Sequence, residues 1–280
     1  MRRTITATLS VLALTAALVG CGGSDGDAGG GTPTRPTAKL PTLDILVTND
    51  DGYAAPGIDA LVERLRDLPG VEITVVAPAT NQSGTSDRAT PGDVSALTAA
   101  KVATASGFPA TAVTGFPADS VNYALDVLDL EPDLVVAGSN AGQNLGVVAP
   151  ISGTVGAART AVRRGYPAVA VSQGLADPAD FGPSVDTAVA WIESNRAALA
   201  GGVERTELLE VVNVNAPACL LVRGVVAVPL ASAPNAEPVD CASRVTAGPD
   251  DAASFAHGFA TVTFLTADTQ TVTSTTSWPR

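Results

Sequence analysis

From Leu43 to Val214, short apolar runs rich in β-branched residues alternate with segments whose apolar residues recur at helical spacing. This alternation constrains the fold most, because it predicts an α/β protein with a mostly parallel sheet and helices on both faces. The predicted strands are residues 43–48, 71–77, 134–137, 168–171 and 208–214, and the predicted helices are residues 58–68, 119–130, 155–164 and 185–199. After Pro217, short Val- and Thr-rich stretches predict a β-rich extension over residues 218–280, so the α/β core spans residues 43–217.

The charge balance and the histidine count limit which ligands and metal ions this chain can bind. Its 280 residues include 16 Lys and Arg against 28 Asp and Glu, for a net charge of -12, and one His. This acidity argues against binding of duplex nucleic acid, which needs clustered cationic side chains. A single His excludes metal sites that need two or more His ligands. Any metal would bind carboxylates and neutral oxygens, which suit Mg²⁺, Mn²⁺ or Ca²⁺ better than Zn²⁺ or Cu²⁺.

The N-terminus has the layout of an export signal. Arg2 and Arg3 precede an apolar run that is too short to remain in a bilayer. The run ends in Leu-Val-Gly-Cys, which resembles a bacterial lipobox and predicts a signal peptide over residues 1–20 and a lipidated Cys21. An ordinary signal peptide that contains a Cys is the alternative. We expect residues 21–42, rich in Gly, Asp, Thr and Pro, to be a disordered tether that holds an exported domain on the outer face of the cell membrane.

Cys219 and Cys241 remain in the mature chain. Export permits a disulfide between them, but sequence alone does not show whether their Cβ atoms approach. Two buried free thiols are the alternative, and both interpretations stay open here. His257 lies in the β-rich extension, where we expect it at the surface or at a helix cap rather than in a catalytic site.

Polar residues follow three of the predicted strands. The first strand is followed by Asn49, Asp50 and Asp51, the second by a segment with Ser83, and the third by a segment with Asn140. The carboxyl ends of parallel strands meet at one edge of the sheet, so these side chains converge there. Adjacent carboxylates repel each other unless a cation neutralises them, and amide oxygens also bind hard cations. The alternative for the two acids is a turn that caps the next helix.

Ser152, Gly153 and Thr154 lead directly into a predicted helix. Hydroxyls and free backbone N–H groups at a helix start form an anion site that commonly holds phosphate. For this segment alone, a plain helix N-cap is the simpler interpretation. Together with the carboxylates and amides, however, it indicates metal-assisted hydrolysis of a phosphate ester.

Four motifs occur in the order found in the SurE family, the survival-protein 5′/3′-nucleotidases, and the resemblance runs from about Leu43 to about Leu265. The motifs are NDDG…APGI at residues 49–58, AP…QSG at 77–84, NAGQNLG at 140–146 and SGTV at 152–155. The resemblance implies a Rossmann-like core with a β-rich C-terminal part that exchanges between subunits, in a homodimer or homotetramer. It also implies hydrolysis of nucleoside 5′- or 3′-monophosphates with one Mg²⁺ or Mn²⁺.

Site residues carry over from the family motif by motif. The implied metal ligands are Asp50, Asp51, Ser83 and Asn140, and the two acids are also the implied catalytic residues. The implied phosphate-binding residues are Asn49, Asn144, Ser152, Gly153 and Thr154.

The chain departs from the family pattern at four positions. Ala137 and Ser139 stand where the family commonly has Ser and Ile, Ile151 where it commonly has Tyr, and Thr160 where it usually has an acidic residue. If that Tyr lines the substrate site, base preference differs here. One competing hypothesis is a lipid-anchored protein that binds nucleotide or phosphate without turnover. Another is a receiver-like domain phosphorylated on Asp50 or Asp51, which the export signal argues against.

Overall fold

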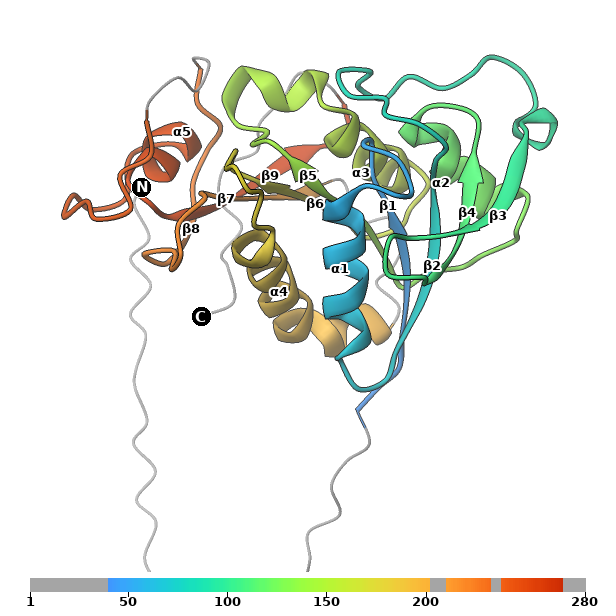
Figure 1. The fold of residues 1–280 in the computed structure, drawn as a ribbon, viewed down its shortest axis with the longest axis horizontal. Helices are drawn as coiled ribbons and strands as arrows, with labels where there is room; N and C mark the ends of the chain where they lie inside the picture. The colour runs from blue at the N-terminus through green and yellow to red at the C-terminus, as the bar shows by residue number, and fades with distance from the viewer. Residues whose placement is uncertain (1–39, 202–209, 233–237, 269–280) are drawn as a thin grey trace, which may run out of the picture. The chain divides into compact units, whose positions relative to one another are not determined.

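A computed structural model describes residues 40–201, 210–232 and 238–268 of the chain. This part contains a nine-stranded sheet in the order β3-β4-β2-β1-β5-β6-β7-β9-β8 (Figure 1). Strand pairing is parallel from β4 through β7, whereas β3 is antiparallel to β4 and β9 is antiparallel to β7. The predicted α/β class and mostly parallel sheet are therefore confirmed.

The helices and strands follow the predicted alternation. The strands are β1 (Leu43–Thr48), β2 (Val71–Pro78), β3 (Ala99–Ala103), β4 (Pro109–Val113), β5 (Leu134–Ala141), β6 (Ala168–Gln173), β7 (Glu210–Ala216), β8 (Val225–Ala227) and β9 (Ala260–Thr266). The α-helices are α1 (Pro56–Arg66), α2 (Pro117–Asp126), α3 (Gly153–Arg163), α4 (Gly182–Ala200) and α5 (Asp251–Ala256), and the 3-10 helices are η1 (Val94–Ala96) and η2 (Gly146–Ile151).

Helices cover both faces of the sheet (Figure 1). Helices α1 and α4 pack on the face that carries Ile45 and Val47, whereas α2 and α3 pack on the face that carries Leu46. Successive side chains of a strand point to opposite faces, so β1 is buried on both sides after Asp44. This double burial explains why β1 reads as a continuous apolar run instead of an alternating one.

The chain reverses its direction across the sheet at β1. From β1 it continues to β2 on one side, and later returns to β5 on the other side. In such sheets a crevice forms beyond the carboxyl ends of the two strands that flank the switch, and ligands bind there. The fold therefore directs attention to the segments that follow β1 and β5.

The structure corrects three details of the predicted elements. The helix predicted over residues 119–130 ends at Asp126, and Asp129 beyond it adopts a positive φ of 53° that no helix can contain. Strands β3 and β4 were not predicted, because their Ala-rich segments lack clear apolar periodicity. The C-terminal region contains the unpredicted helix α5, which Asp250 caps by accepting a hydrogen bond from the Ala253 N–H at 2.9 Å.

The described C-terminal segments extend the same sheet, because β9 inserts between β7 and β8. The predicted signal peptide, the lipidated Cys21 and most of the predicted tether lie outside the described residues. In the described part of the chain, every helix is too short or too polar to cross a bilayer.

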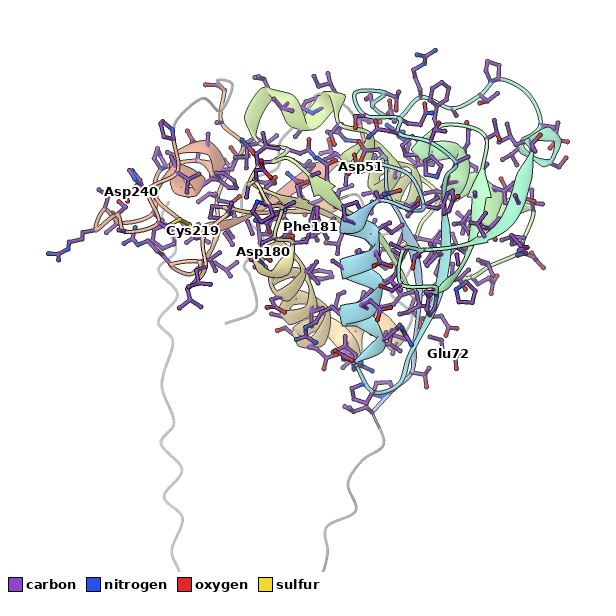
Figure 2. The ribbon with its side chains drawn as sticks, viewed as in Figure 1. Asp51, Glu72, Asp180, Phe181, Cys219 and Asp240 are labelled. Carbon is purple, nitrogen blue, oxygen red and sulfur yellow. A yellow bond between two sulfur atoms is a disulfide. The ribbon has the colours of Figure 1, made fainter. Side chains whose placement is uncertain are left out.

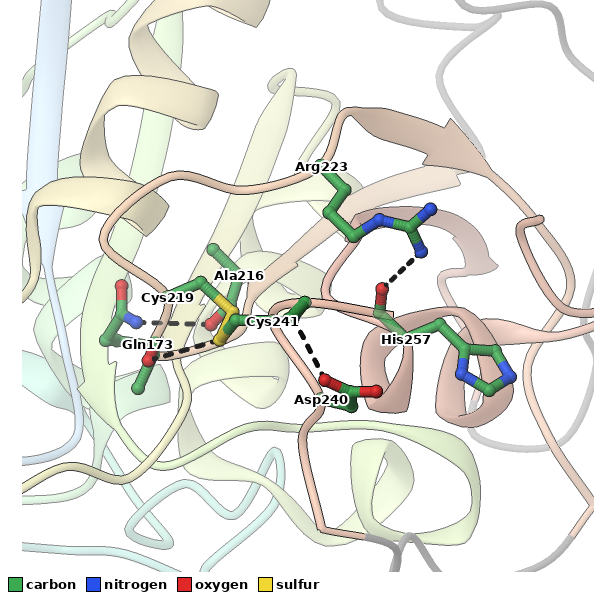
Figure 3. Close-up of a disulfide and its surroundings, with 9 residues drawn as sticks. Gln173, Ala216, Cys219, Arg223, Asp240, Cys241 and His257 are labelled. Carbon is green, nitrogen blue, oxygen red and sulfur yellow. Dashed lines mark hydrogen bonds between the residues drawn. A yellow bond between two sulfur atoms is a disulfide. The ribbon is translucent and has the colours of Figure 1, made fainter. Parts of the chain in front are cut away.

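Cys219 and Cys241 form a disulfide with a Cα–Cα distance of 5.6 Å (Figure 3). The bond ties the segment that follows β7 to the segment that leads to α5. Cys219 is buried and Cys241 is exposed. Of the two interpretations left open by the sequence, the structure supports the disulfide.

Replacing both cysteines with Ser is expected to lower the free energy of unfolding by about 3 kcal/mol, because the cross-link restricts an unfolded loop between residues 22 positions apart. Urea unfolding of the oxidised protein and of the double variant measures this difference. The wild type in reducing agent should unfold at the midpoint of the variant. Equal midpoints for the variant and the oxidised wild type would contradict a stabilising role.

Candidate functional site

A tight turn follows β1 and presents the two adjacent acids. Asn49 closes this turn: its Oδ1 accepts a hydrogen bond from the Gly52 N–H at 3.1 Å, and its Nδ2 donates to the Gly52 carbonyl at 2.9 Å. Gly52 has a φ of 103°, which only glycine adopts readily. Asn49 is fully buried, so in this structure it supports the turn from within.

Asp50 points into the protein, toward the start of α3. Its Oδ1 accepts a hydrogen bond from the Thr154 hydroxyl at 2.5 Å, and the residue is 2% exposed. Gly153 makes this approach possible, because a Cβ at that position would lie 2.7 Å from the Asp50 Cβ. The sequence therefore needs glycine here for packing, beside any contact with an anion.

Burial raises the pKa of Asp50 from 3.8 to about 6, and the nearby Asp51 carboxylate adds to the increase. The hydrogen bond from Thr154 acts in the opposite direction. A cation bound beside the two acids would favour the charged form of Asp50.

Asp51 connects the ends of β1, β2 and β5, and it lies beyond the N-terminal end of α1 (Figure 2). Its Oδ1 accepts hydrogen bonds from Asn81 Nδ2 at 2.9 Å and from Ser83 Oγ at 3.5 Å. Its Oδ2 accepts one from the Ala141 N–H at 3.2 Å, directly after Asn140. The structure thus brings Asp51 together with Ser83 and with the segment of Asn140, as the motif order implies.

This donor set has the chemistry of a site for a hard divalent cation. Asp50 and Asp51 supply carboxylates, Ser83 a hydroxyl oxygen and Asn140 an amide oxygen. The Asn140 Nδ2 donates to the Gly142 carbonyl at 2.6 Å, and no described residue donates to its Oδ1. In the described segments, no group of three or more His, Cys, Asp or Glu side chains is placed to hold a metal. A cation at this crevice would therefore rely on two carboxylates and neutral oxygens.

The start of α3 is both a helix cap and a possible anion site. Ser152 is the N-cap, and its Oγ accepts a hydrogen bond from the Val155 N–H at 3.2 Å. The structure therefore confirms the predicted role of this segment as a helix N-cap. The N–H groups of Gly153 and Thr154 belong to the first turn, where a helix has no acceptors of its own. The Thr154 N–H is directed at the Asp50 carboxylate, whereas the Gly153 N–H remains available to an anion.

Asn144, an implied phosphate-binding residue, is 5% exposed, the same value as Ser152 at the helix start. Its Nδ2 donates to Ser172 Oγ at 2.9 Å. A direct contact between this amide and phosphate would require exchange of that bond. Its main chain is held by Asn213 and Asn215 of β7, which sequence reasoning did not include in the site. The available signal was two polar residues at alternate positions of an otherwise apolar strand.

Asp251 is a second residue that sequence reasoning missed. Fully buried at the start of α5, it accepts hydrogen bonds from the Gly146 N–H at 3.0 Å and the Ala231 N–H at 2.7 Å. Burial raises the pKa of its carboxyl group, whereas the two N–H donors lower it. Asp251 thereby joins the C-terminal extension to the loop that precedes α3.

Replacing Asp251 with Asn is expected to destabilise the fold by about 1–3 kcal/mol, because an amide offers one oxygen and turns an N–H group toward a donor. Thermal unfolding should then begin several degrees lower, at roughly 2–4 °C for each kcal/mol. Asp240→Asn is the matched control, since Asp240 is exposed and accepts a local hydrogen bond from the Ala242 N–H. Equal melting temperatures for Asp251→Asn and the wild type would refute the bridging role.

Fold and crevice together define a doubly wound α/β protein whose site, at the topological switch point, is built from carboxylates, hydroxyls and amides. The chain belongs to the SurE family, because the family described as survival protein SurE matches residues 45–240. The crystal structure of SurE protein from Aquifex aeolicus is similar to this chain with a TM-score of 0.66 and 27% sequence identity. The similarity covers 80% of this chain and 94% of that one.

Curated relatives named 5′-nucleotidase SurE show the same similarity in sequence. The protein from Methanopyrus kandleri is 39% identical over 186 residues, covering 62% of this chain and 66% of the relative. The protein from Nitratidesulfovibrio vulgaris is 40% identical over 194 residues, covering 66% of each. The protein from Methylococcus capsulatus is 43% identical over 155 residues, covering 55% of this chain and 59% of the relative. This chain therefore spans just under two thirds of the length of the curated relatives it matches.

Proposed function

We propose that this protein is a metal-dependent phosphatase that hydrolyses nucleoside 5′- or 3′-monophosphates to nucleoside and phosphate. One observation carries the proposal: the buried Asp50 carboxylate is held by Thr154, at the first turn of a helix whose Gly153 N–H can receive phosphate. Family membership and the names of the relatives support the same activity.

The residues at the crevice would have separate roles in such a reaction. Asp50 and Asp51 would hold one Mg²⁺ or Mn²⁺, with Ser83 and Asn140 as neutral oxygen ligands. The bound cation would polarise a phosphoryl oxygen and lower the pKa of a bound water. Thr154 orients the Asp50 carboxylate through its hydroxyl group. The two acids are also the carboxylates at this site that could accept a proton from the attacking water.

Phosphate recognition is assigned to the α3 start, formed by Ser152, Gly153 and Thr154, where the Gly153 N–H is free to bind an anion. The Thr154 N–H is directed at Asp50, so Thr154 would contribute to phosphate binding by exchanging that contact. The roles of Asn49 and Asn144 in binding phosphate remain part of the proposal. Their side-chain amides are engaged with Gly52 and Ser172, so these residues would act mainly through the backbone they hold.

The cellular setting is also a proposal. The lipobox at Cys21 supports export and a lipid anchor on the outer face of the cell membrane, with extracellular nucleotides as substrates. Family membership supports a homodimer or homotetramer. The competing function is a lipid-anchored protein that binds nucleotide or phosphate without turnover, but a pure anion receptor has no need of two acids beside its ligand.

The decisive experiment measures phosphate release from a panel of nucleoside 5′- and 3′-monophosphates with Mg²⁺ and with Mn²⁺. A soluble form that lacks residues 1–21 allows the assay without detergent. The proposal expects release that requires the cation. Binding of nucleotide or phosphate without release would favour the receptor instead.

A further inference from the structure

Two asparagines of β7 hold the main chain of Asn144, which follows the end of β5 two strands away. The Asn144 N–H donates to Asn215 Oδ1 at 2.7 Å. The Asn144 carbonyl accepts from Asn213 Nδ2 at 3.1 Å and from Asn215 Nδ2 at 3.2 Å. Both main-chain polar groups of this loop residue are thus bound by side chains from the interior of the sheet.

Both polar atoms of the Asn215 amide bind Asn144, whereas Asn213 Nδ2 also donates within the sheet, to Thr263 Oγ1 of β9 at 3.1 Å. Asn213 and Asn215 are fully buried on a strand whose neighbouring positions are Val211, Val212 and Val214. Burial of an amide is unfavourable unless it is hydrogen-bonded, and Asn213 Oδ1 has no partner in the described part of the chain. Apolar residues would fill a buried strand at lower cost, so the contacts with Asn144 account for Asn215 and, together with the bond to Thr263, for Asn213.

Asn144 begins the segment that leads to the proposed phosphate site at the start of α3. Gly146 follows and is bound by Asp251, and the 3-10 helix η2 then runs from Gly146 to Ile151, directly before Ser152. The contacts at Asn144 restrain the start of this segment, while Ser86 holds its end by donating to the Pro150 and Ile151 carbonyls. Together these contacts determine where α3 begins.

We infer that Asn213 and Asn215 are positioning residues for the phosphate site: they hold the loop that places Ser152, Gly153 and Thr154. This inference rests on the proposed function only for the identity of the anion. The two asparagines make no contact with Asp50 or Asp51, so their effect is expected on anion binding and not on binding of the cation.

The test compares Asn215→Leu with the wild type, each as the full chain in mild detergent. Titration calorimetry measures the affinities for inorganic phosphate and for Mn²⁺. We expect phosphate affinity to fall by about tenfold, since the variant loses both hydrogen bonds to Asn144, while Mn²⁺ affinity stays within about twofold. If substrate is turned over, KM should rise by a similar factor, with a smaller change in kcat.

Thr261→Val is the matched control. Thr261 lies opposite Asn215 on β9, is equally buried, and its hydroxyl has no partner among the described residues. Loss of this hydroxyl should leave both affinities unchanged. If Asn215→Leu does not fold, Asn215→Ser takes its place, because a serine side chain is too short to hold Asn144.

Phosphate affinity within about twofold of the wild type in a folded Asn215 variant would overturn the inference. A parallel loss of phosphate and Mn²⁺ affinity, with a lowered melting temperature, would also overturn it in favour of a general structural role. If the wild type binds phosphate but releases none from nucleotides, the proposed phosphatase activity is refuted. The role of Asn213 and Asn215 is then decided by the phosphate affinities of the variants. A wild type that binds no phosphate refutes the inference itself.

Discussion

Replacing Asp50 with Asn is expected to abolish cation-dependent phosphate release, with a fall in kcat/KM of about a thousandfold or more. The amide has nearly the volume of the carboxylate but lacks the charge that a divalent cation requires. The substitution also alters the acceptor of the Thr154 hydroxyl, which in the wild type donates to Asp50 Oδ1 at 2.5 Å. Steady-state assays with and without added Mn²⁺ measure the effect.

Asp44→Asn is the control for this substitution. Asp44 lies near the start of β1, the end of the strand that is remote from Asp50, and its side chain is exposed. Its replacement should leave kcat/KM unchanged. Full activity in the Asp50 variant would refute the assignment of the crevice as the catalytic site.

Removal of divalent cations is expected to abolish activity, and the affinity for Mn²⁺ should fall as the pH drops below about 6. The pKa of Asp50 is about 6 in the cation-free protein, because the carboxyl group is buried beside Asp51. A carboxylate must be deprotonated to bind a cation, so below this pKa the apparent affinity decreases by about tenfold per pH unit. Calorimetric titrations with Mn²⁺ between pH 4.5 and 7.5, after treatment with a chelator, measure this dependence.

The same shift makes the stability of the cation-free protein depend on pH. The pKa of Asp50 is higher in the folded state than its ordinary value of 3.8, so the folded state binds this proton more tightly. The stabilisation is fully present below pH 3.8 and is lost as the pH rises through about 6. At pH 7 the ionised carboxylate costs up to about 3 kcal/mol, and a bound cation offsets this cost.

Asp50→Asn provides the control for both pH effects. Without an ionisable group at this position, the difference in melting temperature between pH 4.5 and pH 7 should become smaller. Addition of Mn²⁺ should no longer raise the melting temperature at pH 7. A Mn²⁺ affinity of the wild type that does not change between pH 4.5 and 7.5 would contradict the role of Asp50 as a ligand.

The central part of the fold was predictable because its signals are local. β1 agrees with the prediction at both ends, and the other predicted core strands lie within a few residues of those observed. Most of their residues are buried on both faces and therefore read as short apolar runs, although the first four residues of β2 alternate between half-buried and exposed. The missed elements lack such a run: β3 and β4 stabilise the edge of the sheet mainly by pairing, and α5 has only six residues.

The candidate site was predictable only in part. The convergence of Asp50 and Asp51 with Ser83 and Asn140 follows from the rule that parallel strands end at one edge. The roles of Thr154 toward Asp50 and of Asp251 toward Gly146 did not follow, because each joins residues about a hundred positions apart. Such contacts leave no periodic pattern in the sequence.

The amino-acid sequence by itself determined the fold class, the family and the oxygen-rich chemistry of the crevice, because these depend on local apolar patterns and on contiguous motifs. The tertiary structure alone decided which groups support the site. It paired Cys219 with Cys241, buried Asp50 enough to raise its pKa, and placed Asn213 and Asn215 against the main chain of Asn144. Burial and long-range hydrogen bonds arise only when distant segments pack, so no single stretch of sequence can contain them.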